Sequence, residues 1–130
     1  MASRDIALLE PETRAKVEKF LALARVSGLD LLVTCTVRTA VEQAELYAQG
    51  RTKPGRVVTW AKPGQSLHEQ GRAVDVVPML GGKCCWSTLG GDLVLWQQAG
   101  ALGKRAGLEW AGDWPAKIRE FPHFQNKGKA

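Results

Sequence analysis

An aspartate inside an apolar run is the sequence feature that most constrains how this chain can fold. Residues 72–77 read Arg-Ala-Val-Asp-Val-Val, which alternates enough to predict a β-strand. In that strand Asp75 shares one face with Ala73 and Val77. A carboxylate among valines is costly to bury unless it is paired or bound to a cation. His68 precedes it in a loop or a single helical turn, so a metal ion shared by His68 and Asp75 would satisfy the carboxylate.

The second histidine of the chain also follows a carboxylate. His123 lies three residues after Glu120, and the sequence contains only 2 histidines. Three protein ligands of the N and O type, with one position open, are the arrangement expected of a catalytic zinc. We therefore predict that His68, Asp75 and His123 hold one Zn²⁺. Glu120 remains free to move protons as a general base. The spacing alone leaves open that both histidines are surface residues without a metal.

An arginine is predicted at a corner between a strand and a helix. Residues 31–37 are rich in β-branched side chains and predict a buried strand. Arg38 follows it, and Thr39 with Glu42 forms a capping box that opens a helix to about Gln49. A fixed positive charge at this corner could stabilise an oxyanion. The alternative is a surface arginine that serves the fold.

The remaining segments predict an α+β fold with a small antiparallel sheet and about three helices. They are an amphipathic helix at 11–27, a loop at 50–65 with a short strand at 57–60, a helix at 93–106 capped by Asp92, and a short final strand that carries Glu120 and His123.

Length and composition limit the class of protein. A chain of 130 residues, 45% hydrophobic and 24% charged, is typical of one globular domain. No run approaches the roughly 20 apolar residues of a membrane span, so we expect no stable membrane insertion. The first residues lack the apolar segment of a signal peptide, so we expect synthesis in the cytoplasm.

Charge and cysteine content are less specific. The net charge of +5 is spread along the chain and favours polyanions in general, whether nucleic acid, anionic lipid or an acidic cell-wall polymer. Cys35, Cys84 and Cys85 form no C-x-x-C pair, so we predict free thiols.

A longer pattern includes the first of these site residues. Ser66-x-His68-x-x-Gly71-x-Ala73-x-Asp75 resembles the signature of the zinc D-alanyl-D-alanine peptidase family. That family includes vancomycin-resistance dipeptidases and carboxypeptidases and phage L-alanyl-D-glutamate endopeptidases. The resemblance covers roughly residues 34–125, and five further segments are similar to the phage and spore-forming-bacterium branch: 36–39, 42–43, 46–52, 107–114 and 122–125. Ala111 departs from it, because the branch usually has a second glycine there.

The resemblance implies a role for each candidate residue. His68, Asp75 and His123 would be the zinc ligands, Glu120 the general base and later acid, and Arg38 the group that polarises the scissile carbonyl. Ser66 and Gln43 would lie in the substrate groove. Closeness in sequence adds Trp110 and Trp114 as residues that line the site. The implied fold is hedgehog/DD-peptidase-like.

These observations lead to one functional prediction with two alternatives. We expect residues 1–130 to form a single catalytic domain without a separate wall-binding domain. It would act as a monomeric L-alanyl-D-glutamate endopeptidase on peptidoglycan stem peptides. As a phage-type endolysin it would reach the wall after release from the cell, with no nucleic acid partner. The alternatives are a D-alanyl-D-alanine carboxypeptidase with the same site, and a non-catalytic module that binds zinc or a polyanion.

Overall fold

The structure, a computed structural model, describes residues 3–127 and has an α+β fold. Its helices are α1 (Pro11–Val26), α2 (Ala40–Ala48) and α3 (Gly91–Arg105). Its strands are β1 (Leu31–Cys35), β2 (Ala73–Leu80), β3 (Lys83–Cys84), β4 (Glu109–Trp110) and β5 (His123–Gln125). Three single 3₁₀ turns are η1 (Ile6–Leu8), η2 (Leu67–Gln70) and η3 (Ala111–Asp113).

The five strands form one antiparallel sheet that is centred on β2. The strand order is β1-β2-β5-β4, and β3 pairs with the far end of β2. Val74 is opposite Phe124, and Asp75 is opposite His123. Because side chains alternate along a strand, Asp75 and His123 share the face opposite to Val74 and Phe124. The register of two strands therefore places two candidate ligands side by side.

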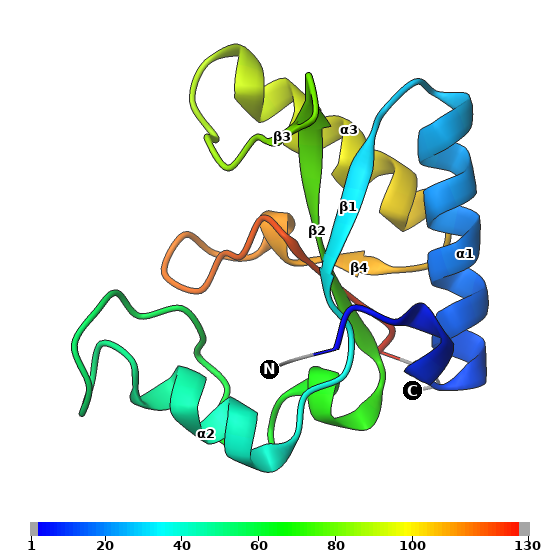
Figure 1. Ribbon diagram of the computed structural model, residues 1–130. Coiled ribbons are helices and arrows are strands. Elements are labelled where there is room, and N and C mark those ends of the chain that lie inside the picture. The colour runs from blue at the N-terminus through cyan, green and yellow to red at the C-terminus, as the bar shows by residue number, and fades with distance from the viewer. Residues whose placement is uncertain (1–2, 128–130) are drawn as a thin grey trace.

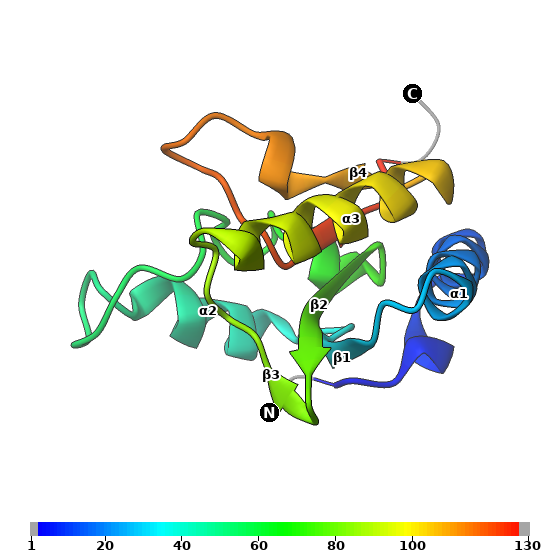
Figure 2. The same cartoon turned by 90° about the horizontal axis from the view of Figure 1, so that it is seen from above.

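Helices α1 and α3 pack together on the apolar face of the sheet. Their buried side chains form one core with β2, β4 and β5: Val17, Phe20, Ala24, Trp96, Ala99, Leu102, Val74, Val76, Trp110 and Phe124. Figures 1 and 2 show α2, with the long connection that follows it, set apart from this pair.

Two glycines let α3 approach the sheet closely. A Cβ atom on Gly103 would lie 2.4 Å from the Phe124 ring, and one on Gly100 would lie 2.3 Å from the Trp110 ring. These aromatic rings fill the space that side chains at the two positions would otherwise take.

The helices expected from the sequence are present, and the differences are local. The capping box of Thr39 and Glu42 at α2 is confirmed. Helix α3 begins before Asp92, because Gly90 is its N-cap with a φ of 56°, a conformation that favours glycine. The predicted cap at Asp92 is therefore wrong.

Two strand predictions also need correction. Residues 57–60 form no strand, and this connection is held instead by side-chain hydrogen bonds described below. The final strand begins at His123, so Glu120 lies in the turn that precedes it. Within residues 3–127, no helix has the length and apolar character needed to cross a membrane.

Candidate active site

Three predicted ligands converge on one point on the polar face of the sheet. The Asp75 Oδ1 atom lies 3.2 Å from His68 Nε2 and 3.3 Å from His123 Nδ1. Asp75 and His123 come from paired strands, and His68 comes from turn η2. This turn ends at Gly71, whose φ of 67° reverses the chain into β2 as its sequence predicts.

The outer nitrogen of each imidazole also has a partner. His68 Nδ1 lies 2.7 Å from the carbonyl oxygen of Thr36, just beyond β1. His123 Nε2 lies 2.8 Å from Gln125 Oε1. An N–H on each of these outer nitrogens leaves the inner nitrogen of a neutral ring with a lone pair that faces Asp75.

This donor set fits a zinc ion. Two ligands bound at 2.0–2.1 Å in tetrahedral geometry lie about 3.3 Å apart, which matches the separations around Asp75 Oδ1. Two imidazole lone pairs and a carboxylate that face one point also need a cation between them. One carboxylate and two imidazoles, each oriented by an outer partner, are a usual zinc environment.

In the absence of a metal, a proton supplies that positive charge. Burial alone would lower the pKa of His68, but the Asp75 carboxylate outweighs it and raises the pKa to about 10. Burial would likewise raise the pKa of Asp75, but the two histidines hold it well below its usual range.

A fourth potential ligand, Cys35, lies close by but on the wrong side of His68. Cys35, His68 and Asp75 each offer a ligand atom within 4.8 Å of the others. However, Cys35 Sγ is 3.6 Å from Nδ1 of His68, whereas Asp75 faces Nε2. One ion cannot use both edges of the same ring, and Nδ1 already contacts Thr36. We therefore assign Cys35 to the packing behind His68.

Arg38 is held next to this centre at the corner between β1 and α2. Its Nη2 donates to Asp75 Oδ2 at 3.2 Å, so the two carboxylate oxygens face different partners. Its Nη1 donates to Gln43 Oε1 at 3.0 Å. Its Nε is buried with no hydrogen-bond partner among the described residues. The guanidinium is therefore fixed beside the ligands as a positive charge, in agreement with the expected position.

Gln43 lies beneath the cavity and not in its lining, which corrects the expectation of substrate contact. Its side chain is fully buried. Its Nε2 donates to the Ala61 carbonyl at 2.7 Å and to Thr59 Oγ1 at 3.3 Å, while its Oε1 accepts from Arg38. One amide thus joins Arg38 to the connection that carries Trp60.

Replacing Gln43 by leucine is expected to lower the free energy of unfolding by about 1–3 kcal/mol, because it leaves partly buried polar groups of Arg38 and Ala61 without this partner. Urea unfolding of the purified protein measures this change. Gln97 is exposed on α3, and Gln97→Leu is the matched control. Equal stability of the two variants would contradict the bridging role.

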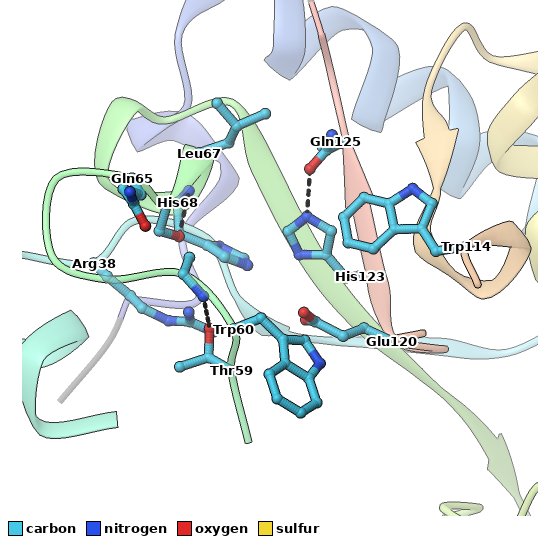
Figure 3. A pocket seen from close by; sticks show the side chains of 12 residues that line it. Arg38, Thr59, Trp60, Gln65, Leu67, His68, Trp114, Glu120, His123 and Gln125 are labelled. Carbon is cyan, nitrogen blue, oxygen red and sulfur yellow. Dashed lines mark hydrogen bonds between the residues drawn. The ribbon is translucent and has the colours of Figure 1, made fainter. Parts of the chain in front are cut away.

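A cavity of about 350 Å³ is lined by His68 and His123, two of the three predicted ligands. Trp60, Trp114 and Arg38 all line it, and Figure 3 shows Arg38 on the left of the cavity, Trp114 on the right and Trp60 below. Trp60 is 48% exposed, and the indole of Trp114 lies 5.6 Å from the His123 ring between centroids. The lining of the cavity therefore combines two tryptophan rings with a fixed positive charge.

Glu120 lines the same cavity from the turn before β5. Its carboxylate is directed toward the space beside His123 (Figure 3). Burial raises the pKa of Glu120, and Asp75 adds to this effect, while His123, His68 and Arg38 oppose it. Glu120 is not one of the three converging ligands, so its carboxylate remains available to a water molecule or a substrate in the cavity.

The other two predicted contact residues have different positions. Ser66 lines the cavity and also accepts a hydrogen bond from His68 N at 3.2 Å, which caps turn η2. Trp110 lies in the core, with its ring stacked on Phe124 and its Nε1 donating to the Phe121 carbonyl. The expectation that Trp110 lines the site is corrected, because its indole points to the face that carries Phe124. Trp114, the other tryptophan expected there, does line the cavity.

Several residues of the site were not identified from the sequence. Thr59 and Trp60 belong to an irregular loop whose course no periodicity reveals. Gln125 belongs to a segment that resembles the family, but the resemblance gives it no role. The pairing of β4 with β5, which places Glu109 opposite Gln125, was not expected because β4 has only two residues.

The chain is similar to known peptidases. A peptidase M15 family model described as D-alanyl-D-alanine carboxypeptidase matches residues 60–126. The chain is 33% identical to the peptidoglycan L-alanyl-D-glutamate endopeptidase CwlK of Bacillus subtilis (strain 168) over 127 residues, 90% of this chain and 72% of that protein. It is 29% identical to the L-alanyl-D-glutamate peptidase of Listeria phage A118, with 90% of this chain covered but only 37% of the phage protein.

The fold is also that of solved structures. A vancomycin-resistance D,D-pentapeptidase, VanY, in complex with Zn(II) superposes with a TM-score of 0.68 at 18% identity, over 92% of this chain and 73% of that one.

Proposed function

Since the chain belongs to the peptidase M15 family of zinc metallopeptidases, we propose that it cleaves the L-alanyl-D-glutamate bond of peptidoglycan stem peptides. Membership of this family identifies the chain as a peptidoglycan peptidase. Which bond of the stem peptide it cleaves is what we propose. The support for this bond is the similarity to two L-alanyl-D-glutamate peptidases, at 33% and 29% identity.

One structural observation carries the chemical part of the proposal. Asp75 Oδ1 lies within 3.3 Å of two histidine nitrogens, each ring is oriented by an outer hydrogen bond, and both histidines line a cavity. We propose that His68, Asp75 and His123 hold one Zn²⁺ there. When bound, such an ion would act as a Lewis acid and would provide a water nucleophile at neutral pH.

The chain's own residues supply positioning and proton transfer. Glu120 accepts the proton from the attacking water, and the proton then goes to the nitrogen of the leaving amine. Arg38 presents a fixed positive charge to the carbonyl oxygen as negative charge develops on it. Trp60 and Trp114 hold the stem peptide between them, and Ser66 contributes a hydroxyl at the cavity edge.

We further propose that residues 1–130 act as one catalytic domain in an endolysin that reaches the wall after release from the cell. The similarity to a phage peptidase supports this role. The net charge of +5 would add general affinity for the acidic wall polymer. Wall binding that does not weaken with added salt would contradict the charge contribution.

Digestion of purified muropeptides tests the choice of bond. Fragments identified by mass should carry a new D-glutamate amino terminus. Release of free D-alanine would instead support a D-alanyl-D-alanine carboxypeptidase, which is the description of the matching family model. No cleavage by zinc-loaded protein would support the non-catalytic alternative.

Zinc affinity should increase with pH. In the metal-free protein, His68 keeps its proton below its pKa of about 10, so near neutral pH a zinc ion must displace that proton. The dissociation constant is therefore expected to fall about tenfold per pH unit between about pH 7 and 8.5. Competition with a chromophoric chelator measures it, and a dissociation constant independent of pH would contradict a protonated His68.

A further inference from the structure

A line of polar side chains from β4 and β5 extends behind His123, on the side away from Asp75. His123 Nε2 contacts Gln125 Oε1 at 2.8 Å, and Gln125 Nε2 donates to Glu109 Oε1 at 3.4 Å. The second carboxylate oxygen, Glu109 Oε2, accepts from Trp114 Nε1 at 2.6 Å. The strand register places Glu109 directly opposite Gln125. Figure 3 shows the His123 end of this line, with Trp114 beside it.

The direction of every bond in this line follows from Glu109. A carboxylate only accepts hydrogen bonds, so Gln125 must turn its amide nitrogen toward Glu109. Its carbonyl oxygen then faces His123 and can only accept. His123 must therefore carry its proton on Nε2, which leaves the Nδ1 lone pair directed at Asp75.

We infer that Glu109 is a positioning residue that fixes His123 in the tautomer able to bind zinc, acting through Gln125. This inference rests on the zinc site of the proposed function. Glu109 also holds the indole of Trp114 over the His123 ring, so the same carboxylate orients one ligand and one wall of the cavity. Glu109 also forms an ion pair with Lys127, whose Nζ lies 3.4 Å from Oε1.

A glutamine at position 109 tests the inference because it has one acceptor where two are needed. In Glu109→Gln, the new amide nitrogen faces either Trp114 N–H or the amide nitrogen of Gln125. In either arrangement two N–H donors face each other. Gln125 is then no longer fixed by residue 109 and can rotate its carbonyl oxygen away from His123. Zinc affinity, measured by chelator competition on the full chain, is expected to fall about 10–100-fold.

Exchange of the two side chains should restore the affinity. In the double variant Glu109→Gln with Gln125→Glu, the carboxylate at 125 accepts from His123 and from the amide of residue 109. The amide oxygen at 109 then accepts from Trp114, so each bond has a donor and an acceptor and the net charge is unchanged. Asp113→Asn is the matched control, since it removes one negative charge from the same segment and disrupts only an exposed pair with Lys104.

The outcomes separate this inference from the proposed zinc site. Wild-type affinity in Glu109→Gln, or a double variant as weak as the single one, would overturn the positioning role alone. Wild-type protein that binds no zinc would overturn the site itself. If Glu109→Gln fails to fold, the double variant decides: wild-type zinc affinity supports the role, and lower affinity overturns it.

Discussion

Replacing Glu120 by glutamine is expected to lower kcat on peptidoglycan by about 10²–10⁴-fold, the contribution typical of a positioned general base. The amide keeps the shape of the side chain but cannot take a proton from water. Because Glu120 is not one of the converging ligands, zinc affinity should remain within a few fold of wild type. The combination of lost turnover and retained zinc is the specific signature of this role.

The measurement is the initial rate of muropeptide cleavage by zinc-loaded protein, with zinc content determined on the same sample. Glu45→Gln is a suitable control, because Glu45 is exposed on α2 and its substitution removes the same charge. Nearly full activity in the Glu120 variant would remove Glu120 from the mechanism. Loss of zinc together with activity would indicate that Glu120 serves as a ligand.

Replacing Asp75 by asparagine is expected to abolish both zinc binding and activity. Asp75 faces two histidines with Oδ1 and Arg38 with Oδ2, so an amide nitrogen at either position meets another donor or the metal. Loss of an outer partner of a ligand typically weakens metal binding 10–100-fold, and loss of the central carboxylate should exceed about 100-fold.

Chelator competition at one pH measures this loss, and Asp113→Asn again controls for the removed charge. The metal-free variant should also lose the raised pKa of His68, which depends on the Asp75 carboxylate. Titration of His68 by NMR detects that change independently of zinc. An unchanged zinc affinity would show that the ion binds elsewhere.

The sequence predicts the chemistry of the site better than it predicts the structure that supports the site. An aspartate within a valine-rich strand requires a cation, and this requirement pointed to His68 before any contact was known. The register that places Asp75 opposite His123 depends on a three-residue strand, whose pairing no local pattern reveals. Resemblance to a family was needed to favour this zinc site over two surface histidines without a metal.

The errors concern residues whose role depends on which way a side chain points. Gln43 and Trp110 are close to the site in sequence, but the helix and the strand that carry them turn their side chains into the interior. Glu109 and Gln125 were missed because their importance lies in hydrogen-bond direction across a β pair. Such relationships appear only when the strands are placed side by side.

X-ray absorption at the zinc edge of the loaded protein tests the central claim most directly. If His68, Asp75 and His123 hold the ion, all ligands should be nitrogen or oxygen at about 2.0–2.2 Å. Cys35 lies on the other edge of His68 and should contribute nothing. A sulfur ligand at about 2.3 Å would contradict this account and place the ion on the Cys35 side of the histidine.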